Sequence, residues 1–200
     1  MGNSFYEEYP NVNYRISLAH TQTPHAISAW LRKGDIDARN MDLPPFNKSR
    51  FEKVLEEAKL LSYEEPSGYL QTLQKLCASA GVALVYTPCL PKAPVSGCAR
   101  WVADHPVIQL SGRYKFNDRF WFTFFHEACH ILKHGKKGYF LEEVEGVENP
   151  QDKEEEANQF ATEILVPSSI IQTIKGAGTV YEPQIKEYAR RNRIHPGILV

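Results

Sequence analysis

The sequence lacks any run of apolar residues near the ~20 that a membrane-spanning helix requires, and its beginning, MGNSFYEEYP, has neither the basic nor the apolar region of a secretory signal. Cysteine is scarce: the four cysteines among 200 residues match no CxxC zinc pattern and are too few for a disulfide-rich secreted domain. Positive and negative charges nearly balance, because the chain has 23 lysines and arginines and 24 acidic residues. This balance argues against a protein that works by coating nucleic acid. We therefore expect a cytoplasmic protein with reduced thiols, although the spacing leaves a Cys89–Cys98 disulfide open.

The chain does contain enough apolar material for a core, since 42% of its residues are hydrophobic and 12% are aromatic. Apolar periodicity and capping residues predict helices over residues 24–33, 51–61, 67–80, 117–134, 153–165 and 182–193, and strands over 82–86, 98–102 and 107–111. Helices around a small sheet indicate the α+β class. We expect a helical N-terminal appendage over residues 1–66, whose first helix ends at Gly34, and one domain over residues 67–200.

The strongest motif is an HExxH sequence formed by His126, Glu127 and His130 within the helix expected over 117–134. Two histidines four residues apart lie on one face of a helix, so both imidazoles can bind one metal ion. Glu127 lies beside such a metal rather than on it, where it can take a proton from the attacking water. So short a motif also arises by chance, and its surroundings therefore decide how it is interpreted.

Most other residues of this helix are apolar, which indicates that it is buried on most sides. Its polar residues nevertheless lie on a single stripe, made of Thr123, His126, Glu127, His130 and His134. Ionisable groups on a buried helix are unfavourable unless a metal or a water-filled cleft receives them. The alternative is a helix with two hydrogen-bonded core histidines. His134 either lines the cleft, where it can stabilise an oxyanion, or is an exposed histidine at the end of the helix.

A catalytic zinc site requires three protein ligands and one open position. The extended HExxHxxGxxH pattern is absent, because Lys133 and Lys136 occupy the positions of its glycine and its last histidine. The third ligand must therefore come from another segment. The helix expected over 153–165 offers Glu154, one turn before the apolar face of that helix. Asn158, one turn further on, is placed to hydrogen-bond a ligand histidine.

Both segments also allow simpler interpretations. The three glutamates at 154–156 can all serve only to stabilise the helix N-terminus electrostatically, and Glu155 and Glu156 are expected to point more to solvent than Glu154. Cys129, inside the HExxH motif, is expected to be a small packing residue. The competing hypothesis is that a nearby metal makes its thiol oxidisable.

The segments FTFFHEACHILKH and EEEANQFATEILVP resemble the ImmA/IrrE metallopeptidases, and the expected strands GVALVY and SGCARWVADHPVIQL fit the same layout. The resemblance covers about residues 75–170. It implies a zincin-like fold, zinc bound by His126, His130 and Glu154, and Glu127 as general base. The chain departs from the family pattern in having Ala128 and Cys129 inside HExxH, both of which are small. It also has no recognisable helix-turn-helix sequence.

Motif and resemblance together predict a zinc-dependent endopeptidase. The resemblance implies that it cleaves a protein partner, such as a helix-turn-helix repressor or an antitoxin-like regulator, in a stress-response or toxin–antitoxin setting. We expect neither direct nucleic-acid binding nor membrane binding. The rival interpretation is a non-proteolytic module that binds a partner regulator; Glu127 favours the enzyme, because a structural zinc site does not need it. The hairpin over 98–111 is expected at the edge of the sheet, where residues 107–110 would hold substrate by strand addition.

Overall fold

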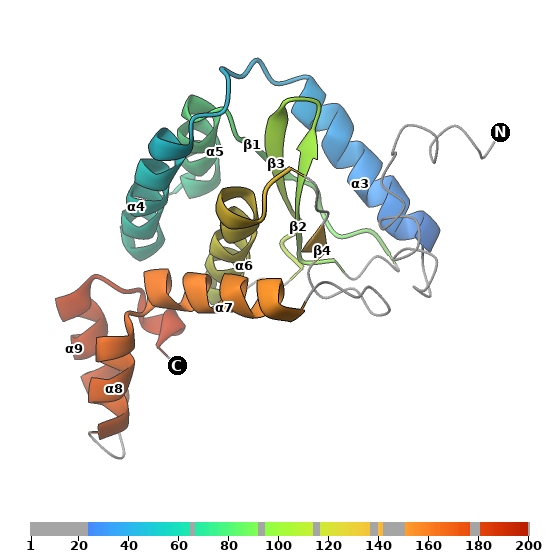
Figure 1. Cartoon of the computed structure of the whole chain (residues 1–200). Helices are drawn as coiled ribbons and strands as arrows, with labels where there is room; N and C mark the ends of the chain where they lie inside the picture. Colours follow the sequence, from blue (N-terminus) through green and yellow to red (C-terminus); the bar gives the residue numbers. More distant parts are fainter. Residues whose placement is uncertain are drawn as a thin grey trace.

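The computed structural model describes residues 24–64, 67–91, 95–113, 117–136, 140–141, 151–176 and 181–199. Its helices are α3 (Pro24–Arg39), α4 (Lys48–Glu64), α5 (Tyr69–Ser79), α6 (Asn117–Cys129), α7 (Gln151–Leu165), α8 (Ser168–Gly176) and α9 (Glu182–Asn192), with a π-helical turn η1 (His130–His134) and a 3-10 turn η2 (Pro196–Ile198). Its strands are β1 (Ala83–Tyr86), β2 (Gly97–Val102), β3 (His105–Leu110) and β4 (Phe140–Leu141). The predicted α+β class is confirmed (Figure 1).

The described strands form one mixed sheet in the order β1-β3-β2-β4. β1 runs parallel to β3, whereas β2 is antiparallel to both β3 and β4. The predicted hairpin is confirmed, and Ala103, with φ of 53°, lies in the turn between β2 and β3. Its predicted place at the sheet edge is wrong: β3 lies in the centre and is hydrogen-bonded on both sides, so residues 107–110 have no edge for strand addition. β1 and β4 form the edges of the described sheet.

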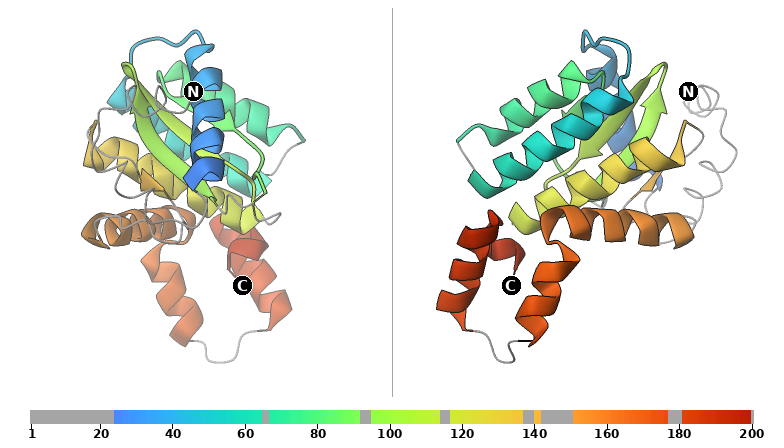
Figure 2. Two further views of the ribbon diagram at one scale, coloured as in Figure 1. Left: turned by 90° about the vertical axis from the view of Figure 1, so that its right-hand side faces the viewer. Right: turned by 60° about the vertical axis from the view of Figure 1, so that its left-hand side comes forward.

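Helices α4, α5 and α6 lie on one face of the sheet and enclose the larger core, while α3 crosses the other face (Figure 2). Trp121 and Phe124 of α6 pack in this core with Ile108 and Leu110 of β3, and all four are almost completely buried. Burial of each such side chain contributes about 1.5–3 kcal/mol. The helix that carries the HExxH motif is therefore held rigidly between the sheet and its neighbours.

The prediction that Gly34 ends the first helix is wrong, because α3 continues to Arg39. Gly34 is buried, and a Cβ atom on it would lie only 2.0 Å from Oε1 of Gln109 on β3. Its lack of a side chain lets α3 approach the sheet closely. A glycine that serves close approach has the same sequence signature as one that ends a helix.

A buried polar network joins α3 to the sheet. The side chains of Arg100 and Asp35 are both 0% exposed, and Nη2 of Arg100 donates to Oδ1 of Asp35 at 2.7 Å and to Oε1 of Gln109 at 2.7 Å. Gln109 Nε2 donates in turn to the carbonyl of Trp30 and to Oγ1 of Thr87. The described part of the N-terminal segment thus packs directly on the sheet. The division of the chain near residue 66 stays a prediction.

The remaining elements follow the sequence closely. Asn47 caps α4, since its Oδ1 accepts from the backbone N–H of Arg50 at 2.9 Å. α7 ends just before Pro167, and α8, which was not predicted, forms with α9 a pair of helices that extends from α7 away from the sheet (Figures 1 and 2). Among the described helices, none combines the length and apolar character needed to cross a membrane.

All four cysteines lie in the described part of the chain, and none forms a disulfide. Cys89 is exposed, whereas Cys98 is buried in β2, so the disulfide left open by their spacing is not formed.

Candidate metal centre

The HExxH helix changes its geometry in the middle of the motif. α6 is a regular α-helix up to Cys129, and residues His130–His134 continue it as a π-helical turn. The chain then leaves the helix at Gly135, whose φ is 73°, as its glycine predicts. The wider turn was not predicted. Single π-helical turns are frequent at functional sites, because they alter the direction of side chains along one helix face.

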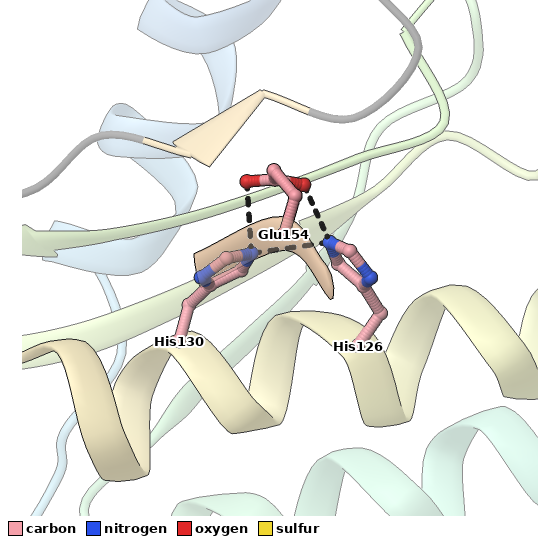
Figure 3. A group of neighbouring side chains, drawn as sticks. All are labelled: His126, His130 and Glu154. Carbon is pink, nitrogen blue, oxygen red and sulfur yellow. Dashed lines mark hydrogen bonds and ion pairs between the residues drawn. The ribbon is translucent and has the colours of Figure 1, made fainter. Parts of the chain in front are cut away.

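The structure brings together the three residues proposed as metal ligands (Figure 3). Nε2 of His126 lies 3.1 Å from Nε2 of His130. Glu154 reaches the pair from α7, with its Oε2 3.2 Å from Nε2 of His126 and its Oε1 3.4 Å from Nε2 of His130. The two imidazoles are buried, and the Glu154 side chain is 24% exposed.

These donors fit a metal ion. Ligand atoms about 2.0–2.1 Å from a tetrahedral zinc lie about 3.3 Å from one another, which matches the three separations. Burial, with the neighbouring His126 and His134, lowers the pKa of His130 to about 2, so this imidazole is neutral and carries a lone pair. Two imidazole nitrogens and one carboxylate are the ligands of many catalytic zinc sites, and they leave a fourth position open.

Asn158 of α7 fixes the orientation of His126. Its Oδ1 lies 3.0 Å from Nδ1 of His126. An amide oxygen can only accept a hydrogen bond, so Nδ1 carries the proton and the lone pair of Nε2 faces the centre. The sequence anticipated this contact from spacing alone.

His134 orients His130 in the same way. Its side chain is only 4% exposed, which rules out the alternative of an exposed histidine. Nδ1 of His134 lies 2.7 Å from Nδ1 of His130, and its Nε2 lies 2.9 Å from Oε2 of Glu156. Because a carboxylate accepts, the proton of His134 is on Nε2, its Nδ1 accepts from His130, and Nε2 of His130 faces the centre with its lone pair.

Glu156 is the site residue that sequence reasoning missed. It is 45% exposed, in line with the expectation for its position, yet it contacts His134 and also forms an ion pair with Lys133 at 2.8 Å. Hydrogen bonds from Lys133 and His134 lower the pKa of Glu156, so it is a carboxylate at neutral pH. Helical periodicity alone cannot reveal this contact, because it joins α7 to a residue of the π-helical turn that follows α6.

Glu127 is completely buried on the side of α6 that faces β2. The group of three convergent donors consists of His126, His130 and Glu154 and does not include Glu127. Cys129, the other residue singled out within the motif, is also buried, and burial raises the pKa of its thiol to about 11. This favours the interpretation of Cys129 as a packing residue.

One of three comparisons with known proteins identifies a family. A comparison with curated proteins gives no match, and a comparison with solved structures gives none either. The model of the peptidase M78 family, described as the IrrE N-terminal-like domain, matches residues 77–191, which is more than half of the chain and includes every residue of the centre. The chain therefore belongs to this family of metallopeptidases, the ImmA/IrrE family that its HExxH segment resembles.

Proposed function

We propose that this protein is a cytoplasmic zinc-dependent endopeptidase whose metal is held by His126, His130 and Glu154. One observation carries the proposal: the donor atoms of His126, His130 and Glu154 converge at ligand–ligand distances, and the buried carboxylate of Glu127 lies on the helix that carries both histidines. A structural zinc site uses four protein ligands and has no need of Glu127. Three ligands with an adjacent carboxylate are the arrangement of a hydrolytic site.

Held by His126, His130 and Glu154, a zinc ion would supply Lewis-acid chemistry, which polarises a carbonyl and acidifies water. Glu127 accepts a proton from the attacking water at its carboxylate and delivers it to the nitrogen of the leaving amine. Asn158 and His134 hold the two imidazoles so that their Nε2 atoms stay directed at the centre. The buried surroundings of Glu127 strengthen its electrostatic interactions during the proton transfer.

The substrate class that we propose is a protein regulator of the helix-turn-helix type, such as a repressor or an antitoxin-like protein. The support for this is the family resemblance, because the centre itself shows only the chemistry. We expect no direct contact with nucleic acid or membrane. Cleavage of such a regulator would place the protein in a stress-response or toxin–antitoxin setting.

The test is to incubate the zinc-loaded protein with the regulator encoded beside its gene and to identify cleavage products by mass spectrometry. Glu127→Gln should bind zinc and fold but lower kcat by about 10²–10⁴-fold, because an amide cannot accept the proton. Glu155→Gln makes the same chemical change on an exposed residue and should retain full activity. If Glu127→Gln cleaved the regulator as fast as the wild type, Glu127 would not be the general base. If the wild-type protein bound the regulator without cleaving it, the non-proteolytic module would be favoured.

A further inference from the structure

Gly97, the first residue of β2, lies directly against the proposed general base. It is buried, and a Cβ atom built on it would lie 2.7 Å from Oε1 of Glu127 and 2.5 Å from Cγ2 of Thr123. Both distances are shorter than any normal contact between a Cβ atom and another heavy atom. The carboxylate of Glu127 therefore occupies space that a side chain at position 97 would fill.

The backbone does not explain a glycine at this position. The described glycines with positive φ are Gly68, Gly81, Gly112 and Gly135, and Gly97 is not among them. An alanine could adopt the extended conformation of β2 without backbone strain, and its intrinsic preference for a strand is no worse than that of glycine. The constraint on residue 97 is thus the proximity of the Glu127 and Thr123 side chains.

Strand β2 is held in place by hydrogen bonds to the neighbouring strand β3. Ser111, which follows β3, ties down the residues just before Gly97: its backbone N–H donates to the carbonyl of Ser96 at 3.0 Å, and its hydroxyl donates to the carbonyls of Val95 and Ser96. These residues are all buried. A side chain at position 97 would therefore displace the Thr123 methyl group and the Glu127 side chain, whose carboxylate is its flexible end.

We propose that Gly97 is a positioning residue for catalysis: the absence of its side chain creates the space in which the Glu127 carboxylate is held beside the metal. This inference rests on the proposed function. It predicts that Gly97→Ala moves the carboxylate while leaving His126, His130 and Glu154 in place. A displacement of about 1 Å at a catalytic group can lower the rate about 10²-fold.

The experiment compares Gly97→Ala with Gly176→Ala, a glycine that has no heavy atom within 4 Å of the added Cβ. Zinc content, unfolding midpoint, kcat and KM are measured, together with calorimetric binding of acetohydroxamate to the zinc-loaded protein. A hydroxamate binds zinc through its two oxygens and hydrogen-bonds to an adjacent carboxylate, so it reports the position of Glu127 without any substrate. Gly97→Ala should bind one zinc and keep KM, but lower kcat about 10²-fold and hydroxamate affinity about tenfold. Gly176→Ala should match the wild type.

A double-mutant cycle tests whether Gly97 acts through Glu127. In a Glu127→Ala background, Gly97→Ala should change hydroxamate affinity by less than about twofold, because the carboxylate that it displaces is already absent. An equal effect in both backgrounds, or unchanged kcat and hydroxamate affinity in Gly97→Ala, would overturn the proposal. If Gly97→Ala does not fold, the double variant Gly97→Ala/Thr123→Ala is used, because Thr123→Ala removes the other close contact. This double variant should bind hydroxamate more weakly than the single variant Thr123→Ala.

The hydroxamate measurement also separates this inference from the proposed function. A wild-type protein that binds zinc but no hydroxamate would overturn both the proposed centre and the role of Gly97. Equal hydroxamate affinity in wild type and Gly97→Ala would overturn the role of Gly97 alone.

Discussion

Nδ1 of His134 lies 2.7 Å from Nδ1 of His130. On the other side of the same ring, Nε2 of His134 lies 2.9 Å from Oε2 of Glu156. A chain of three residues thus connects a partly exposed carboxylate on α7 to an imidazole that faces the centre. Each hydrogen bond fixes the tautomer of the next ring, because a carboxylate only accepts and a neutral imidazole donates from one nitrogen. Outer hydrogen bonds of this kind raise the basicity of a ligand histidine and hold its ring.

The first prediction follows from this chain. His134→Ala should weaken zinc affinity about 10–100-fold, since His130 loses the partner that holds its tautomer. Glu156→Gln should have a smaller effect in the same direction, because an amide can still accept a hydrogen bond from His134. Zinc affinity is measured by competition with a chromophoric chelator. Glu155→Gln is the control, and unchanged affinity in His134→Ala would show that the contact has no influence on the centre.

The second prediction concerns the ligands themselves. His126→Ala and His130→Ala should each abolish stoichiometric zinc binding, and Glu154→Ala should weaken it greatly, because two protein ligands do not make a stable site. Glu155→Ala removes a neighbouring carboxylate that lies outside the group of convergent donors and should retain one zinc per chain. The measurement is the zinc content per chain of each variant after gel filtration. Full zinc in Glu154→Ala would mean that the third ligand has been assigned wrongly.

The centre could be predicted from the sequence to the extent that it obeys helical periodicity. The spacing of His126, Glu127 and His130 places them on one helix, and Glu154 and Asn158 lie one turn apart on another, so both sets follow from local geometry. Glu156 and Gly97 could not be predicted. Glu156 contacts a residue of the π-helical turn on another helix, and the contact of Gly97 depends on how closely β2 packs against α6.

The third prediction concerns the buried ion pair between Asp35 and Arg100. Asp35→Ala should lower the free energy of unfolding by about 3–5 kcal/mol, because it leaves the Arg100 guanidinium buried without its anionic partner. Asp37→Ala, on the same helix, removes a pair with Lys33 whose side chains are 33% and 58% exposed, and it should cost at most about 1 kcal/mol. Urea unfolding of both variants tests the difference. Equal small losses would show that α3 contributes little to the stability of the sheet.

The same ion pair shows where sequence reasoning fails for the fold. The expected helices and strands were mostly recovered, because each carries its own apolar period and caps. The packing of α3 depends instead on Gly34, Asp35, Arg100 and Gln109, which are far apart in the sequence. A buried Asp or Arg is indistinguishable by residue type from an exposed one, so only the tertiary structure reveals that these four residues join helix and sheet.

The fourth prediction concerns the thiols. Burial raises the pKa of Cys98 to about 12 and that of Cys129 to about 11, and it raises the pKa of Cys77 as well, whereas Cys89 is exposed. Because the thiolate is the reactive form, a disulfide reagent at pH 7.5 should modify one thiol rapidly and the other three only after unfolding. Cys89→Ser should remove the rapid phase.

The raised pKa of Cys129 also determines how this thiol responds to a reagent or oxidant that reaches it in the folded protein. For a reagent that reaches Cys129 in the folded protein, the rate of thiol modification should rise about tenfold per pH unit below the pKa. The reason is that the fraction of thiolate rises about tenfold per pH unit in that range. Mild peroxide at neutral pH should therefore leave zinc content and activity equal in wild type and Cys129→Ala. If the alanine variant instead retained zinc under peroxide while the wild type lost it, the thiol would be a redox switch within the HExxH helix, and burial would not protect it.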